Sequence, residues 1–423
     1  MHFPDRQQLE AHQLSKLNAL LRATRTRNSF YGVKFQGLPE QVSSLEEWSR
    51  FPTTSKRELS QQADGNGLAP HHTFPADDYI RLHRTSGTTG RPLIVMDRRE
   101  DWEWWLGIWQ KILDTAELRP GTVVFMAFSF GPFIGFWSAN DACLARGCRV
   151  VPGGGLSTAA RLDLIQATHS TALFCTPSYA LHLADEARRR SLAPSQLGLR
   201  KIVVAGEPGG SLPAVRRRIE EAFAAEVVDH AGATEIGPWG VGTVDGEALE
   251  VIESEFIAEF LPFVSPTASV AISGSHAETD LFELVLTGLG RAGAPALRYR
   301  TGDLVRPDPH YRRSASFVRL EGGVLGRVDQ MITIRGVNVF PSSIESILQA
   351  CDGLQEYRLV ATRRGAMDHL QIEVEEAGSL KEQIEDLMDR RLGLRVEVVQ
   401  VAAHSLPRST DKSKRFLDLR QSS

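Results

Sequence analysis

A loop rich in glycine and hydroxyl side chains is the stretch of this chain best suited to bind phosphate. It runs from Arg84 to Pro92 between two short apolar segments, Tyr79–Leu82 and Leu93–Met96, which predicts strand, loop and strand. Its candidate phosphate-binding residues are Thr85, Ser86, Gly87, Thr88, Thr89, Gly90 and Arg91. The glycines let the backbone approach a ligand, the hydroxyls donate hydrogen bonds, and the arginine adds a positive charge. Because the spacing is not that of a P-loop, a flexible surface hairpin is the alternative.

The elements that must position this loop alternate between apolar strands and helices. Strands are predicted at 123–127, 149–151, 172–175 and 201–205, and helices at 136–145, 159–168, 179–190 and 212–224. This alternation is typical of a parallel sheet with helices on both faces. Ligands of such sheets bind at the carboxyl ends of the strands. Those ends, which we expect to meet at one crevice, are residues 128–133, 176–179, 206–208 and 229–235.

The flanking segments are predicted to be scaffold. An amphipathic helix is expected over residues 7–31, a short one around 44–48, a capped helix start at 53–59, and a tryptophan-rich helix over 101–113 that packs into the core. Residues 240–325 change to short β-rich runs, which favour strand pairs or a small barrel. The last third predicts a compact α+β unit with helices over 342–351 and 380–392 and strands at 357–362, 370–375 and 395–401.

Composition narrows the class of protein. A chain of 423 residues is too long for one ordinary hydrophobic core, so two or three structural units are expected. Its content of 42% hydrophobic and 24% charged residues is typical of a globular protein. A net charge of −4 with mixed signs argues against nucleic acid or a membrane as partner. Four cysteines (143, 148, 175 and 351) show neither metal-site spacing nor a disulfide framework. Without a secretion signal or an apolar run long enough for a membrane span, we expect a cytoplasmic protein.

Four further stretches follow the loop in an order that resembles AMP-forming adenylating enzymes. They are Asp229-His-Ala-Gly-Ala-Thr-Glu-Ile-Gly237, Arg298-Tyr-Arg-Thr-Gly-Asp-Leu304, the run from Gly326 to Pro341, and Leu406-Pro-Arg-Ser-Thr-Asp-Lys412. The stretch Thr176-Pro-Ser-Tyr179, the Asn-Val-Phe-Pro turn and the short length look like the phenylacetate–CoA ligase branch. The resemblance covers residues from about 15 to 420.

The resemblance implies an α/β fold in two domains joined by a hinge. Residues 1–328 would form a large N-terminal adenylation domain of mixed and parallel sheets with flanking helices and a small barrel-like part. Residues 329–423 would form a small mobile α+β domain carrying Lys412. The family's reaction joins a carboxylic acid to AMP from ATP, releases pyrophosphate, and then passes the acyl group to a thiol, usually coenzyme A. Mg²⁺ is the implied metal.

Each motif residue then takes a role implied by the family. Thr234 would donate to phosphates, Glu235 would hold Mg²⁺, and Lys412 would bridge the substrate carboxylate and the α-phosphate, so these three are the candidate catalytic residues. Asp329 would be the hinge. Further ATP-binding candidates are Gly206, Glu207 and Pro208 beside adenine, Asp229, His230 and Ala231, and Asp303 and Arg327 at the ribose. Gly336, Val337, Asn338 and Phe340 would line the pantetheine path.

Each role has a plainer alternative. Glu235 could be a solvated loop acid, Asp303 could close a turn, and Lys412 could belong to a basic tail with Lys414 and Arg415. The pantetheine residues could form an ordinary strand–turn–helix junction. Ser409 and Lys412 also match a β-lactamase pattern, whose other motifs this chain lacks.

Four positions depart from the family pattern. Arg91 stands where the family usually has lysine, and both are cations. Ala231 replaces an aromatic residue that stacks on adenine, with Trp239 or Phe130 as candidate substitutes. Gln330 replaces a second acid after the hinge residue. Asp411 replaces a glycine and would partly offset the charge of the neighbouring lysine.

An apolar, aromatic-walled acyl pocket is expected, and it favours an aryl or arylalkyl acid. Its predicted lining residues are Phe128, Phe130, Phe133, Phe136, Ala205, Ala231, Gly232, Ile236 and Trp239. Alternatives to an acid–CoA ligase are an enzyme that loads carrier-protein phosphopantetheine, a nucleotidyltransferase that leaves AMP on a cofactor hydroxyl, and a non-catalytic nucleotide-binding protein. A homodimer is a further expectation.

Overall fold

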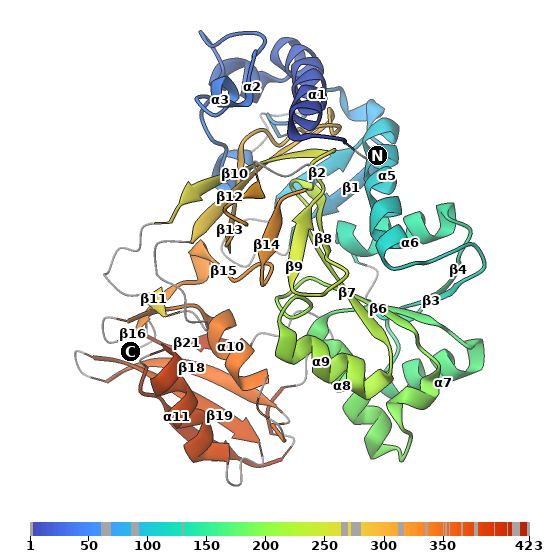
Figure 1. Cartoon of the computed structure of the whole chain (residues 1–423), viewed down its shortest axis with the longest axis vertical. Coiled ribbons are helices and arrows are strands. Elements are labelled where there is room, and N and C mark those ends of the chain that lie inside the picture. The colour runs from blue at the N-terminus through green and yellow to red at the C-terminus, as the bar shows by residue number, and fades with distance from the viewer. Residues whose placement is uncertain are drawn as a thin grey trace.

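A computed structural model describes most of the chain (Figure 1). The described residues are 3–60, 69–85, 93–128, 131–263, 270–271, 281–311, 317–334, 337–349, 351, 353–354, 356–364, 367–375, 380–392, 394–403, 405–407 and 415–420. They form a larger N-terminal part and a smaller α+β part at the C-terminal end. Among these residues, the helices are too short or too polar to cross a membrane.

The centre of the larger part is an eight-stranded sheet in the order β14-β9-β8-β7-β6-β5-β3-β4. Its parallel strands are β3 (Val123–Met126), β4 (Arg149–Pro152), β5 (Ala172–Cys175), β6 (Lys201–Ala205) and β7 (Glu226–Ala233). Three strands extend it antiparallel: β8 (Gly237–Gly242), β9 (Ala248–Val251) and β14 (Arg319–Glu321). The predicted parallel sheet is confirmed, and the predicted β-rich region contributes its antiparallel edge.

Helices cover both faces of this sheet, as the alternation predicts. The helices are α5 (Arg99–Thr115), α6 (Ile134–Ala145), α7 (Thr158–Thr168), α8 (Pro177–Arg189) and α9 (Pro213–Phe223). Successive strand side chains point to opposite faces, so Val124 packs with α5 and α6 in one buried cluster while Phe125 packs with α7, α8 and α9 in another. The tryptophan-rich helix is α5, and burial of Trp102, Trp105 and Trp109 confirms that it packs into the core.

The helix predicted within residues 7–31 is confirmed as α1, and a second short helix follows it. Helix α1 (Arg6–Arg27) ends at Asn28, and α2 (Ser29–Lys34) begins there. The Asn28 side chain accepts from the N–H of Tyr31 at 3.0 Å and donates to the carbonyl of His71 at 2.7 Å. The predicted helix therefore ends near Asn28, as expected, and this capping side chain redirects the chain into α2. Two single-turn helices follow, α3 (Leu45–Trp48) and α4 (Lys56–Leu59).

A second sheet carries the Arg298–Leu304 motif. Its order is β10 (Phe256–Pro262), β12 (Phe282–Gly288), β13 (Tyr299–Val305) and β15 (Gly326–Arg327), all antiparallel. A separate hairpin, β1 (Arg81–Arg84) and β2 (Ile94–Asp97), flanks the candidate phosphate loop and confirms the two predicted strands.

The C-terminal part has its own sheet and its own buried cluster. The elements are β16 (Ile332–Ile334), β17 (Val337–Val339), α10 (Pro341–Gln349), β18 (Tyr357–Arg364), β19 (Met367–Glu375), α11 (Leu380–Leu392), β20 (Glu397–Val401) and β21 (Phe416–Asp418). The cluster of buried residues runs from Ile332 to Val398 and contains no member from the larger part among the described residues. A short strand, β11 (Val270–Ala271), pairs with β17. The boundary between residues 328 and 329 stays a prediction.

The two parts touch at several described places, of which the pairing of β11 with β17 is one. Helix α10 lies against α9, where the Arg218 guanidinium donates to the carbonyl of Gln349 (Figure 1). Phe340, which is buried, packs with Leu281 and Leu304 of the larger part. The arrangement places α10 near the carboxyl ends of the parallel strands, where the candidate site lies.

Candidate active site

The base of the candidate phosphate loop is closed by Thr85. Its N–H donates to the carbonyl of Leu93 at 2.9 Å, and its hydroxyl accepts from the N–H of Leu93 at 3.0 Å. This pair of hydrogen bonds joins the two ends of the loop, and Thr85 is buried. Ser86, Gly87, Thr88, Thr89, Gly90 and Arg91 lie outside the described residues, so their contact with phosphate stays a prediction.

Glu235 lies in the turn between β7 and β8, and its carboxylate is buried with 6% of the side chain exposed. A lysine balances its charge, since Nζ of Lys56 lies 3.0 Å from Oε1 of Glu235. The segment before Lys56 is held in place by backbone hydrogen bonds of Thr54 to both Arg298 and Arg300 on β13. The sequence predicts only scaffold for this segment, and the ion pair adds Lys56 to the site.

Tyr299 connects Glu235 with the Asp303 motif. The tyrosine is buried, and burial, together with the Glu235 carboxylate to which its hydroxyl is hydrogen-bonded, raises its pKa well above the usual value. Asp303 and Arg327 also act on its titration, so both charged groups lie nearby. Three residues that the sequence assigns to ATP binding or catalysis are thus gathered around one phenol.

Arg327 bridges the ribose candidate and the hinge candidate. Its Nη1 donates to Oδ1 of Asp303 at 2.7 Å, and its Nε and Nη2 donate to the two oxygens of Asp329 at 3.0 and 3.3 Å. Although burial alone would lower the pKa of Arg327, these carboxylates raise it, so the guanidinium stays charged. Gly302 has φ of +75°, and a Cβ there would lie 3.1 Å from Nη2 of Arg327, which explains a glycine beside Asp303.

Asp229 organises the turn predicted to border adenine. Its Oδ2 accepts from the Ser211 hydroxyl at 2.7 Å, and its Oδ1 accepts from the N–H of His230 at 2.9 Å. A Cβ on Gly210 would lie 2.4 Å from Cγ of Asp229, so only glycine allows this approach. Burial raises the pKa of Asp229 to about 6, against the hydrogen bonds that lower it. Asp229 therefore stabilises this turn through buried hydrogen bonds.

Glu207, in that turn, and His230, beside it, also have structural partners. Oε1 of Glu207 accepts from the N–H of Ser178 at 2.7 Å, which caps the N-terminus of α8. Gly206 is exposed and has φ of +93°. Burial lowers the pKa of His230 to about 4, so the ring is neutral, and its Nδ1 lies 2.8 Å from the Gly240 carbonyl. Adenine contact at 206–208 stays a prediction.

The strand end at Ala231 carries small side chains and is partly exposed. Ala231 and Thr234 are half-buried, Gly232 is exposed, and Ala231 pairs with Gly240 on β8. Trp239, proposed as a substitute for the missing adenine-stacking ring, is 1% exposed and lies inside the main apolar cluster. Phe130, the other candidate substitute, lies outside the described residues.

Part of the predicted acyl pocket is brought together. Phe128 stacks on Phe136 with ring centroids 4.1 Å apart, and both belong to the cluster that contains Ile236 and Trp239. Phe133 is 36% exposed, and Ala205 is half-buried at the end of β6. The stacked rings and Ala231 would form the walls, with Ile236 and Trp239 behind them. The pocket as a whole stays a prediction.

The residues assigned to the C-terminal part are less completely described. Lys412 and Gly336 lie outside the described residues, and Val337 and Asn338 are placed as backbone of β17. Phe340 is buried against the larger part. The roles of all five residues stay predictions.

The described donor set fits a magnesium ion that is shared with a nucleotide. No group of three or more His, Cys, Asp or Glu side chains able to hold a metal occurs among the described residues. Mg²⁺ in nucleotide sites is usually held by one or two carboxylates together with substrate phosphates and water. The single buried carboxylate of Glu235, with a lysine as its present counter-charge, meets that description.

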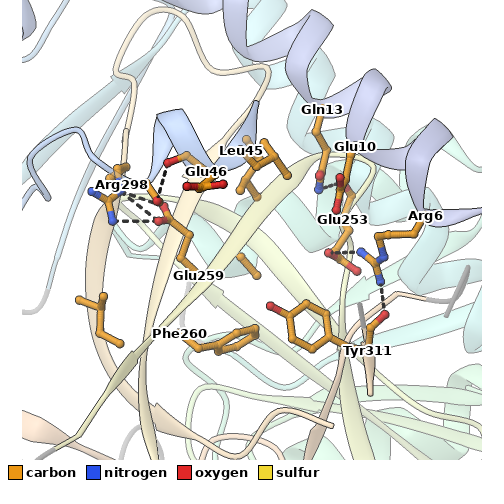
Figure 2. Close-up of a pocket in the computed structure, with 14 residues that line it drawn as sticks. Arg6, Glu10, Gln13, Leu45, Glu46, Glu253, Glu259, Phe260, Arg298 and Tyr311 are labelled. Atoms are coloured by element: carbon orange, nitrogen blue, oxygen red, sulfur yellow. Dashed lines mark hydrogen bonds and ion pairs between the residues drawn. The ribbon is translucent and has the colours of Figure 1, made fainter. Parts of the chain in front are cut away.

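One cavity of about 320 Å³ lies away from these residues, between α1, α3 and β10 (Figure 2). Four carboxylates line it, from Glu10, Glu46, Glu253 and Glu259, against the guanidinium groups of Arg6 and Arg298. Arg6 pairs with Glu253 at 2.7 Å and Arg298 with Glu259 at 2.8 Å. With both cations neutralised and an excess of acid, the cavity would repel a polyphosphate, so the strand ends remain the site.

Comparison with known proteins shows which family the chain resembles over most of its length. The "AMP-binding enzyme" family model matches residues 13–254, and the "AMP-binding enzyme C-terminal domain" model matches residues 336–420. The phenylacetate–coenzyme A ligases of Pseudomonas putida and Thermus thermophilus are each 31% identical over 98% of this chain, and 95% and 98% of their own lengths are covered.

A solved relative matches in more than one conformation. The structure of a 2-hydroxyisobutyryl-CoA ligase in the postadenylation state, bound to R3-HIB-AMP, is 27% identical with a TM-score of 0.87, covering 100% of this chain and 92% of that one. The same protein in the thioesterification state, with 2-HIB-AMP and CoA, gives 0.71, covering 99% and 91%.

Substitution of Asp229 by asparagine should change the pH dependence of stability. The folded-state pKa is about 6 against an ordinary 3.8, so the folded protein binds more protons between these values, and stability falls as pH rises through them. The wild type should therefore lose roughly 2–3 kcal/mol relative to Asp229→Asn between pH 4 and 6.5. Urea unfolding of both proteins at each pH measures this, and a difference that stays constant would contradict it.

Proposed function

Because the chain belongs to the AMP-binding enzyme family, we propose that it activates a carboxylic acid with ATP and transfers the acyl group to coenzyme A. The observation that carries this proposal is the gathering of Glu235, Asp303 and Arg327 around Tyr299 at one end of the sheet. These are a carboxylate for a metal–phosphate complex, an acceptor for ribose hydroxyls and a cation for phosphate. Near full-length similarity to phenylacetate–CoA ligases supports both half-reactions.

In the first half-reaction, a carboxylate oxygen of the acid attacks the α-phosphorus of ATP. The bond from that phosphorus to the bridging oxygen breaks, pyrophosphate leaves, and an acyl-adenylate remains. Glu235 would hold Mg²⁺, and the ion would supply positive charge that neutralises the phosphates. The Thr234 hydroxyl and the 85–91 loop donate to the phosphates. Lys412 spreads its charge over the carboxylate and the α-phosphate, where negative charge shifts in the transition state.

In the second half-reaction, the thiol of coenzyme A loses its proton and attacks the acyl carbon. The bond between that carbon and the AMP oxygen breaks, which yields the thioester and AMP. Rotation of the C-terminal part about Asp329 would remove Lys412 and bring residues 336–340 to the site. The structure of this chain resembles the postadenylation state of the relative, with a TM-score of 0.87, more than its thioesterification state, with a TM-score of 0.71. The salt link between Arg327 and Asp329 would be remade on rotation.

The proposed acid is aryl or arylalkyl. The stacked rings of Phe128 and Phe136 offer an apolar wall for a ring-bearing substrate. Ala231 leaves room on the facing strand end, where the family usually places an aromatic side chain. None of the described pocket candidates has an acidic side chain that could bind an amine on the substrate. This favours an acid whose side chain is uncharged.

The first test is a screen of pyrophosphate release. Purified protein with ATP and Mg²⁺ is given aryl, arylalkyl and aliphatic acids, with and without coenzyme A. We expect release with a subset of ring-bearing acids and a CoA thioester detected by mass spectrometry. A thioester formed only on a carrier protein, or a stable AMP-bearing product without thioester, would replace the CoA ligase assignment. No release with any acid would refute adenylation.

Lys412→Ala should separate the two half-reactions. Loss of one charge contact to the transition state costs about 2.7–4 kcal/mol, so adenylate formation should fall roughly 10²–10³-fold. Thioester formation from a supplied acyl-adenylate should be largely retained, because the lysine leaves the site before that step. Lys414→Ala, two residues away, is the matched control. Equal loss in both half-reactions would contradict the role.

Lys56→Gln should lower the Mg²⁺ concentration needed for half-maximal pyrophosphate release. The lysine competes with the cation for the Glu235 carboxylate, and one half-exposed ion pair corresponds to a change of about three- to tenfold. Lys34→Gln, which removes a comparable pair with Glu58 on the same helix α4, is the control. An unchanged or higher Mg²⁺ requirement would instead assign Lys56 to the phosphates.

A further inference from the structure

A buried ion pair outside the predicted site joins two of its segments. Nε and Nη2 of Arg291 donate to the two oxygens of Asp97 at 2.7 and 2.8 Å, a bidentate geometry. The side chains are 1% and 0% exposed. Nη1 of the same arginine donates to the backbone carbonyls of Thr234 at 2.7 Å and Glu235 at 3.3 Å. One guanidinium therefore holds a carboxylate and the turn that carries the candidate catalytic residues.

The carboxylate belongs to the hairpin that carries the candidate phosphate loop. Asp97 ends β2 and pairs with Arg81 in the register of β1 and β2. At the other end of the hairpin, Thr85 and Leu93 close the base of the loop. The loop and the Thr234–Glu235 turn are far apart in the chain, and this pair is a direct link between the elements that hold them.

The surroundings keep the link in one arrangement. The indole ring of Trp105, on α5, lies 5.2 Å from the guanidinium carbon of Arg291. Nδ1 of His83 lies 3.9 Å from Asp97, and burial keeps that histidine neutral at physiological pH. The nearby carboxylate of Asp101 accepts from the N–H groups of Gly293 and Arg98. Other charged groups near the pair are thus either neutral or separately satisfied.

We propose that Asp97 and Arg291 are positioning residues that set the Thr234–Glu235 turn against the hairpin of β1 and β2 for adenylate formation. This inference rests on the proposed function of that turn. Neither residue needs to touch a substrate. Both act by holding the turn and the hairpin at a fixed spacing. That spacing lets the Thr234 hydroxyl, the Glu235 carboxylate and the loop bind one metal–nucleotide complex.

Arginine is needed because the link requires donors in several directions at once. The planar guanidinium has five N–H groups, of which Arg291 directs some to both oxygens of a carboxylate and others to two carbonyls. A lysine ammonium keeps the charge but has three donors on one nitrogen and cannot span these acceptors. Arg291→Lys should therefore keep the ion pair and loosen the turn.

The test compares Arg291→Lys and the double variant Asp97→Asn/Arg291→Gln with the wild type. The double variant removes both buried charges together, which avoids the cost of one unpaired charge and favours folding. Both variants are expected to melt above the assay temperature and to lose about 10–100-fold in pyrophosphate release, with a raised Mg²⁺ requirement, as for other outer-sphere supports. Thioester formation from supplied acyl-adenylate should change less than about threefold.

The control is another partly buried arginine–acid pair, Arg6 with Glu253 at the cavity of Figure 2. Arg6→Met/Glu253→Gln should leave both half-reactions as in the wild type. The proposal is overturned if the folded Asp97 and Arg291 variants keep wild-type pyrophosphate kinetics, or lose both half-reactions equally, as simple destabilisation would cause. Failure of the wild type to release pyrophosphate with any acid would refute the proposed function itself.

Discussion

The ion pair between Asp97 and Arg291 is the constraint around which the site is arranged. Taking a carboxylate and a guanidinium out of water costs several kcal/mol for each ion, and the cost is offset only when their hydrogen-bonding capacity is met. Here the carboxylate receives two donors and the guanidinium also reaches two carbonyls. Burial, with a smaller contribution from Arg291, lowers the pKa of the neighbouring His71, His72 and His83, so these rings stay neutral. A further positive charge would have no place there.

The site itself is a balanced set of opposite charges in contact with a phenol. Glu235 has Lys56, Asp303 has Arg327, and Tyr299 lies between the two pairs. Such a set suits a ligand that brings its own metal ion and polyanion, because each protein charge can exchange its present partner for one on the ligand. The acidic cavity near α1, whose arginines are also paired, has no such complement for phosphate.

Much of the fold follows from local signals in the sequence. Apolar runs and helical periodicity predict the parallel strands, their covering helices and the hairpin around residues 84–92, and the motif order indicates the family. The short helix α2 after Asn28 was missed because it depends on a side chain that caps this helix while binding a distant carbonyl. Lys56, Asp97 and Arg291 were missed for a related reason. Each pairs with a residue more than a hundred positions away, and no local pattern records such a pairing.

Tyr299 is a different case, because it lies within the Arg298–Leu304 motif but received no role from the sequence. The strand register turns it inward: Tyr299 is buried while Arg300 is exposed, as alternation on a strand requires. Alternation through a motif was therefore the signal that could have found it. The tail around Lys412, a candidate catalytic residue, offers no comparable pattern beyond its resemblance to the family.

The separate buried cluster of the C-terminal part has an evolutionary consequence. Its members run from Ile332 to Val398, so an exchange of coding sequence near Asp329 would carry that cluster whole into a new protein. One described apolar contact that crosses the junction is Phe340 against Leu281 and Leu304, and a transplanted part would need to keep that ring. With the proposed acid pocket in one part and the proposed acceptor path in the other, the two preferences could diverge by recombination as well as by point substitution.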